Sequence, residues 1–334
     1  MTDKVESGRN DRRSFFKTAG AAAAGFALAE ALTGSQALAR DNPGFIKKVL
    51  DAKIIDLSHT WDENSPIASV NPPYSMSLNA THSSTRGTFD PDGQLSFTSE
   101  IQGWSGQHGA PSIDAIGHIG HNGKLFGGVD AAASTSDTRG IGRSGVGAHL
   151  DIAHYPVDLL VNRGVLLDVA RFVMGNGDPL PASGPDSQVT DKVLEATAKR
   201  QRVRLSKGDT VLIRTGWGKY FASSPATYAG ASSAGVVLSG AKFLLKNGAR
   251  VVGDDTLTFE ARPPLAFPPE VPLFQVFPVH MLVIADNGVN IIENFNLEGL
   301  SEAGEYEFVL VVPPLKIRGG TGSALRSFAL VGRD

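Results

Sequence analysis

The stretch from Gln107 to His121 reads Q-H-G-A-P-S-I-D-A-I-G-H-I-G-H. It places three of the chain's eight histidines and one carboxylate, that of Asp114, within fourteen positions. Histidine and aspartate together suit zinc or manganese, because each presents a lone pair to an ion once it is deprotonated. The glycines between them let the backbone bend several ligands toward one ion. The stretch therefore predicts a metal site in this part of the chain.

The composition agrees with a metal site made of nitrogen and oxygen ligands. The chain has 334 residues, 41% of them hydrophobic, which is enough to bury a large core. It has no cysteine, so disulfides, thiolate metal sites and cysteine nucleophiles are excluded. Its formal net charge of -3, without a long like-charged run, excludes the basic surface of a nucleic-acid binder. A small molecule is the partner that this composition favours.

The N-terminus has the pattern of an export signal. From Asp11 to Lys17 the chain reads D-R-R-S-F-F-K, an Ala-rich apolar stretch follows over residues 19–32, and A-L-A at 37–39 is a small-x-small cleavage site. The apolar stretch is too short and too rich in small residues for a membrane anchor. The sequence predicts a removable twin-arginine signal over residues 1–39 and a single mature domain over 40–334. That domain would be exported already folded, periplasmic or secreted, with no stable membrane anchor.

The mature chain alternates short apolar runs with turns rich in glycine and proline, which predicts an α/β fold without repeats. A cap at Thr190 and the pair Asn247-Gly248 mark the start of one helix and the end of another. Residues 60–96 are rich in Ser, Pro, Gly and Asn and are predicted to form long loops. Strands are predicted at 53–57, 95–102, 164–169, 210–215, 250–253, 289–293 and 306–313, and helices at 190–200 and 236–246.

The histidine-rich stretch resembles the signature H-x-G-T-H-x-D-x-P-x-H of the cyclase family of metal-dependent hydrolases, which includes bacterial kynurenine formamidase and isatin hydrolase. His108, Asp114 and His118 fall on the first histidine, the aspartate and the last histidine. Segments 55–59, 164–168, 208–217, 253–256, 280–294 and 314–323 are similar to further family segments in the same order. The resemblance implies a single-domain cyclase-family fold, swivelling β/β/α-like with a mixed β-sheet core, in a homodimer or homotetramer.

The resemblance also implies roles for individual residues. His108, Asp114, His280 and Glu293 would hold one or two divalent ions, zinc or manganese. His118 would act as the general base toward a metal-activated water, which suits an imidazole with an ordinary pKa of ~6.5. The implied reaction is hydrolysis of a small amide, formamide or lactam, as in an arylformamidase.

The stretch departs from the family signature at its centre. Where the family has G-T-H, this chain has Ala110-Pro111-Ser112, so a serine stands where a metal-binding histidine is expected. A neutral hydroxyl is a poor ligand compared with an imidazole. Four alternatives follow: one ion instead of two, weaker binding, replacement of the missing ligand by His121, or loss of catalysis.

Three aromatic or imidazole side chains near family segments, His59, Trp61 and Trp104, are weaker candidates for the lining of a substrate pocket. Large core or interface side chains are an equally good interpretation of the tryptophans.

Two other functions remain open on the same fold. One is a metal-dependent lactonase or dehydratase. The other is a non-catalytic periplasmic protein that binds a small molecule.

Overall fold

A computed structural model describes residues 43–68, 71–107, 109–176, 178–263 and 277–332. The chain divides into two compact units, one formed by residues 53–331 and a smaller one formed by residues 1–52 and 332–334. Helix α2 (Pro43–Asp51) belongs to the smaller unit. The predicted signal over residues 1–39 lies outside the described residues. Among the described helices, none is both long and apolar enough to span a bilayer.

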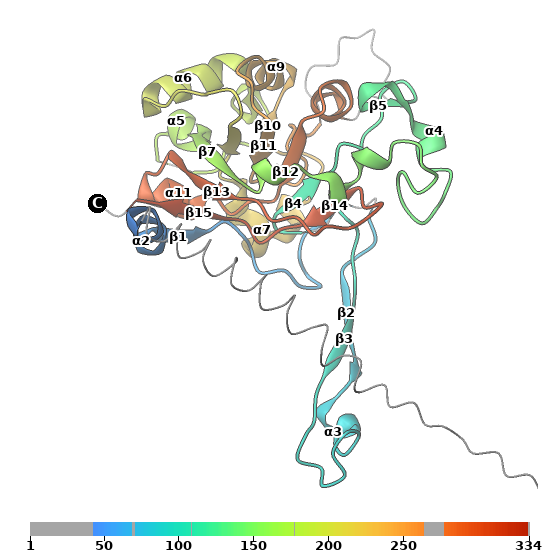
Figure 1. The fold of residues 1–334 in the computed structure, drawn as a ribbon. Helices are drawn as coiled ribbons and strands as arrows, with labels where there is room; N and C mark the ends of the chain where they lie inside the picture. The colour runs from blue at the N-terminus through green and yellow to red at the C-terminus, as the bar shows by residue number, and fades with distance from the viewer. Residues whose placement is uncertain (1–42, 69–70, 108, 177, 264–276, 333–334) are drawn as a thin grey trace, which may run out of the picture. The chain divides into compact units, whose positions relative to one another are not determined.

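The larger unit is built on a mixed sheet, which has nine strands within the described residues (Figure 1). Four central strands run parallel to one another, and the strands on both sides of them are antiparallel. This arrangement confirms the α/β fold with a mixed β-sheet core. In spatial order the strands are β1 (Lys53–Asp56), β15 (Phe328–Val331), β13 (Glu307–Val311), β7 (Val161–Asp168), β9 (Thr210–Arg214), β11 (Val251–Asp254), β12 (Asn290–Glu293), β4 (Ser112–Asp114) and β14 (Gly322–Ala324).

The parallel strands contain apolar runs because side chains are buried on both of their faces. Along β7, Val165 and Leu167 belong to one core cluster, and Leu166 between them belongs to the other. The first cluster also contains residues of α5 (Val169–Met174), α6 (Asp191–Gln201) and α9 (Leu238–Lys246). Helix α6 begins where predicted, because the Thr190 side chain accepts a hydrogen bond from the N–H of Val193.

The remaining elements are short. They are the helices α3 (His82–Thr85), α4 (Ala131–Ser134), α7 (Tyr220–Ser223), α8 (Pro225–Tyr228), α10 (Pro278–His280) and α11 (Glu298–Ala303), the π-helix Met281–Asp286, and the strand pairs β2 (Ser75–Ala80) with β3 (Ser99–Gly103), β5 (Lys124–Leu125) with β6 (Val129–Asp130), and β8 (Gln188–Val189) with β10 (Gly235–Val236).

The prediction of long loops over residues 60–96 was wrong in part. This segment contains β2 and α3, and β2 pairs with β3 to form a narrow two-stranded hairpin (Figure 1). Serine and asparagine alternate with Met76 and Leu78 along β2, which is a strand pattern that the surrounding Ser, Pro and Gly residues obscure. The strand predicted from residue 95 begins only at Ser99. Both apolar side chains of β2 are exposed, so the hairpin adds little to the core.

The parallel strands place a row of charged residues at one edge of the sheet. Because β7, β9, β11 and β12 run in the same direction, their carboxyl ends meet at the same edge. The last residues of these strands are Asp168, Arg214, Asp254 and Glu293, and all four are buried. Buried charges need partners, so this edge is where a functional site is expected.

Candidate metal centre

Three side chains at this edge form a group that could hold a metal ion. One ligand atom from each of Asp114, His280 and Glu293 lies within 4.8 Å of the others, and all three residues are buried. Glu293 lies opposite Ser112 in the ladder between β12 and β4. Because side chains alternate along a strand, Asp114, two residues beyond Ser112, is on the same face as Glu293. The short helix α10 brings His280 to them.

The imidazole of His280 lies at the centre of this cluster. Its Nε2 is 3.2 Å from Oε1 of Glu293 and 3.8 Å from Oδ2 of Asp114. Its Nδ1 is 2.7 Å from Oε1 of Glu260, a residue that no sequence motif indicates. Glu260 stands twenty positions before His280 without a recognisable motif, and no spacing rule connects the two. Tertiary structure alone reveals the contact.

The electrostatics of the cluster favour a bound cation. Burial raises the pKa of Glu293 to about 7, and the charges of Asp114 and Glu260 add to this, although the hydrogen bond from His280 opposes it. Burial lowers the pKa of His280, but its hydrogen bonds with Glu260 and Glu293 outweigh burial, so that this pKa lies well above its usual value. In the described part of the chain, the three carboxylates have only imidazoles as ion-pair partners. A divalent ion would balance the excess negative charge.

The predicted general base lies beside the cluster. Nε2 of His118 is 3.9 Å from Oδ1 of Asp114, and 29% of the His118 side chain is exposed. The imidazole can therefore reach both solvent and the cluster. The turn that places it includes a hydrogen bond from the His118 N–H to the carbonyl of Ala115.

The other residues predicted around the metal have different surroundings. His108 lies outside the described residues. Ser112 is buried, and its hydroxyl is 3.5 Å from Nδ2 of Asn294. Nδ1 of His121 is 2.9 Å from Oδ1 of Asp286, and both side chains are partly exposed. The structure thus brings together Asp114, His280, Glu293 and His118, whereas His121 has an acidic partner of its own.

A small cavity of about 30 Å³ opens onto Glu293. Its aromatic lining comes from Trp61, Tyr74 and Phe221, and the rings of Trp61 and Tyr74 lie 4.7 Å apart. The two weaker pocket candidates support these rings. Trp104 contacts Trp61 edge-on at 6.0 Å, and His59 stacks on Phe221 at 4.2 Å. Polar side chains, among them Gln107 and Asn294, complete the lining, so aromatic rings and hydrogen-bonding groups both face this cavity.

A match with a known family agrees with this geometry. The sequence profile described as putative cyclase matches residues 55–261, which is more than half of the chain. The chain belongs to the putative cyclase family. No curated protein matches the chain.

Solved structures with the same fold include proteins described as hydrolases. A structure described as a novel cyclase is 25% identical to the chain, with a TM-score of 0.69 over 86% of this chain and 91% of that one. Isatin hydrolase A from Labrenzia aggregata is 22% identical, with a TM-score of 0.62 over 89% and 100%. A predicted metal-dependent hydrolase from Bacillus stearothermophilus is 18% identical, with a TM-score of 0.51 over 83% and 98%. The last two similarities confirm the cyclase fold.

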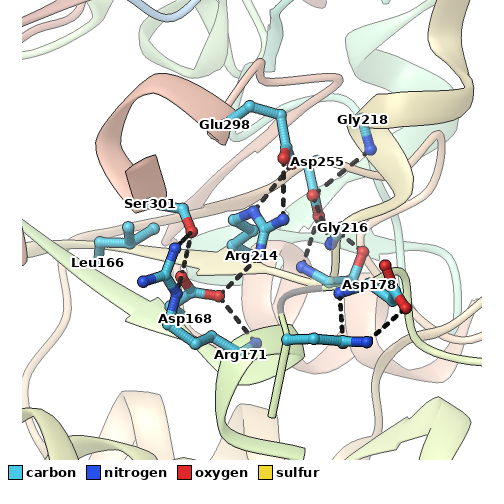
Figure 2. Close-up of polar contacts among 12 residues, drawn as sticks. Leu166, Asp168, Arg171, Asp178, Arg214, Gly216, Gly218, Asp255, Glu298 and Ser301 are labelled. Atoms are coloured by element: carbon cyan, nitrogen blue, oxygen red, sulfur yellow. Dashed lines mark hydrogen bonds and ion pairs between the residues drawn. The ribbon is translucent and has the colours of Figure 1, made fainter. Parts of the chain in front are cut away.

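At the same edge, the chain has a second charge cluster, buried except for the partly exposed Glu298, which contains its own cation (Figure 2). The guanidinium of Arg214 donates to both oxygens of Glu298 at 2.8 and 2.9 Å and to Oδ1 of Asp168 at 2.8 Å. Asp168 also accepts from the hydroxyl of Ser301, at 2.5 Å. Burial alone would lower the pKa of Arg214, but the surrounding carboxylates raise it above its ordinary value. The cluster is therefore balanced without an ion.

Paired carboxylates follow β11, and they belong to the framework of the loop. The Asp255 side chain accepts hydrogen bonds from the backbone N–H and hydroxyl of Thr215 and from the N–H of Gly216. The Asp254 side chain accepts from Thr256 instead. Residues adjacent on a strand face opposite ways, which explains why the two carboxylates have separate partners.

Proposed function

We propose that this protein is a metal-dependent hydrolase that acts on a small aromatic amide, formamide or lactam. One observation carries the proposal: a buried cluster of Asp114, His280 and Glu293 lies beside a pocket lined with aromatic rings. The cluster supplies a metal site, and the aromatic rings beside it supply apolar surface for the organic part of a substrate.

The donor set fits a zinc or manganese ion. Two carboxylates and an imidazole are ligands that both ions accept, and three protein ligands leave a position open to a reactant. A bound divalent ion would polarise the scissile carbonyl group and would lower the pKa of a coordinated water from 15.7 to about 7. We propose a single ion at Asp114, His280 and Glu293, because Ser112 on the same face is a poor ligand.

The chain's own residues would bind the substrate and move its protons. Trp61, Tyr74 and Phe221 would hold an aryl group against the pocket wall. His118, half-exposed beside Asp114, would accept the proton of the attacking water and donate it to the leaving nitrogen. No serine nucleophile is required, since water attacks directly.

The names of the structural neighbours support this class of reaction. The isatin hydrolases and the metal-dependent hydrolase share the fold of the chain over most of its length. Isatin is a cyclic aromatic amide, which would suit the aromatic lining. The homo-oligomer and the export by a twin-arginine signal remain predictions from the sequence.

One observation favours a second candidate, a non-catalytic protein that binds a small molecule. Ser112 occupies a position that faces Glu293 across the ladder, where the family signature has a histidine. A site with fewer ligands could bind a ligand without turning it over. Turnover measurements separate this candidate from the hydrolase.

The first test is metal content together with turnover. We would load the full chain with zinc or manganese, measure bound metal by plasma mass spectrometry, and assay formanilide as a formamide and 2-oxindole as a lactam. Asp114→Asn should lose the ion and the activity, whereas Asp286→Asn, which changes an aspartate paired with a histidine outside the cluster, should keep both. Absence of metal from the loaded wild type would refute the hydrolase. Bound metal without turnover of any amide or lactam would leave the binding protein.

A further inference from the structure

Glu260 is a buried carboxylate on which three N–H groups converge. It is 1% exposed, and its backbone is bridged to Val236 of β10. One oxygen accepts from Nδ1 of His280 at 2.7 Å and from the backbone N–H of His280 at 3.0 Å, and the other accepts from the N–H of Val279 at 3.2 Å. The carboxylate therefore binds both the main chain and the ring of a single residue.

These contacts fix which nitrogen of His280 faces the cluster. A carboxylate can only accept, so Nδ1 must carry the proton in the contact with Glu260. Nε2, which donates to Glu293 in the metal-free protein, is then the nitrogen that can lose its proton and offer a lone pair to an ion, and it lies near both Glu293 and Asp114. A second contact to the backbone of the same residue restricts rotation of the ring.

The position requires a carboxylate and not merely a polar residue. Glutamine has one acceptor oxygen and one NH₂ group, and the NH₂ group would face an N–H donor wherever it was placed among the three. A negative charge at Glu260 also increases the electron density on the imidazole and favours a cation beyond it.

We propose that Glu260 is the positioning residue of the metal centre. It holds His280 in the tautomer and orientation that direct Nε2 at the ion, and it does so without touching the ion itself. This inference rests on the proposed function, because it assumes a metal at Asp114, His280 and Glu293, and it adds a residue that neither the sequence nor the family match indicates.

A purely structural role and a positioning role differ in what they change. A structural carboxylate would lower stability by a similar amount with and without metal. A positioning carboxylate would lower the affinity for the metal itself, and loss of such an outer hydrogen-bond partner of a ligand typically costs about 10–100-fold in affinity. Metal affinity is therefore the deciding measurement.

The experiment compares zinc affinity, measured by competition with a chromophoric chelator, in the full chain and in three variants. Glu260→Gln should weaken zinc about 10–100-fold, and Glu260→Asp, which keeps the charge but shortens its reach, should fall between it and the wild type. Glu298→Gln is the control, because it weakens the Arg214 cluster at the same sheet edge and should leave zinc affinity unchanged. The visible spectrum of the cobalt(II)-loaded protein reports ligand geometry and should change only in the Glu260 variants.

The possible outcomes distinguish failure of the positioning role of Glu260 from failure of the proposed metal-dependent function. If the wild type binds no zinc, cobalt or manganese, the metal-dependent function fails, and the role of Glu260 fails with it. If the wild type binds zinc and Glu260→Gln binds it equally well, or loses no more affinity than Glu298→Gln, only the positioning role is overturned. Should Glu260→Gln not fold, Glu260→Asp decides by the same two readouts.

Discussion

Two groups of carboxylates, all buried except the partly exposed Glu298, lie at the same edge of the same sheet, and they differ in the cation between them. Asp168 and Glu298 surround the guanidinium of Arg214. Asp114 and Glu293 surround the imidazole of His280. Arginine keeps its charge at every accessible pH, whereas a histidine can exchange a proton for a metal ion. The first group is complete as it stands, and the second is complete only with an added cation.

The difference comes from residue type and not from topology. Both groups use the carboxyl ends of parallel strands, where successive strands present their last side chains to one edge. A buried acidic cluster at such an edge therefore indicates a metal site only when a permanent cation is missing from it. The comparison yields four predictions.

Removal of the permanent cation should have the largest effect. Arg214→Leu leaves the buried Asp168 with only the partly exposed Arg171 at 3.4 Å as an ion-pair partner, and breaking a buried pair costs about 3–5 kcal/mol. We expect a large fall in the free energy of unfolding, measured by urea titration, that added zinc does not restore to the wild-type value. Restoration by zinc would show that the Arg214 cluster is also a cation site, and the comparison would fail.

Removal of a carboxylate from the metal cluster should act in the opposite sense on the metal-free protein. Glu293→Gln relieves repulsion with Asp114 and Glu260, so the metal-free variant should melt at the same temperature as the wild type or higher. In zinc, the variant should lack the stabilisation that the wild type gains, and its turnover should fall on the order of 100-fold or more, as when a group that stabilises the transition state is lost. Calorimetry with and without zinc measures the first effect. A metal-free variant that is clearly less stable would contradict it.

Stabilisation by zinc should grow as the pH rises from 6 to 8. The pKa of Glu293 is raised from 4.5 to about 7, so the metal-free native protein holds this proton more tightly than the unfolded chain, and that stability is lost as the pH rises toward 7. The pKa of His280 is also raised, so its contribution is lost above 6.5 as well. Zinc replaces these protons, and it therefore binds more tightly at higher pH. The measurement is the difference in Tm with and without zinc at several pH values, and a constant difference would count against the cluster as the site.

The smallest effect is expected from a pair of charges at the surface. Arg326 forms an ion pair with Asp56 at 2.6 Å, and most of the Arg326 side chain is exposed. Solvent screens such pairs, so Arg326→Ala should leave both Tm and zinc affinity unchanged within error. This variant is the control for Arg214→Leu, because both remove an arginine bound to acids and only burial differs. A loss of stability comparable to that of Arg214→Leu would show that burial is not what separates them.

The sequence predicted the frame of the fold well and its periphery less well. The apolar runs that became β7, β9, β11 and β12 are continuous because helices and loops cover them, and such runs are a strong signal. Strand β2 and its pairing with β3 were missed because β2 is short, exposed and set among turn residues, although a strand overlapping β3 was predicted. Pairing between them depends on residues about twenty-five positions apart, which periodicity alone does not detect.

The candidate site was predictable where a motif marks it. Asp114, His280 and Glu293 follow the family pattern, and the structure places them together. Glu260 was not predictable, since its contact with His280 depends on tertiary structure. The role of Arg214 could have been predicted from the sequence. It is a charged residue at the end of an apolar run, and a buried charge requires buried partners.

The three side chains of the metal cluster come from segments that are far apart in the chain and meet only at the ends of β4, α10 and β12. In evolutionary terms the site is modular, because each ligand can be exchanged by a single substitution while the sheet that carries it stays the same. Position 112 is an example: it lies on the ligand-bearing face of a short strand, and it is a serine where the family signature has a histidine. The same property makes position 112 a starting point for laboratory evolution. Ser112→His would add a ligand without a change of fold, and assays of the variant would show whether an additional metal ligand alters the substrate that the protein accepts.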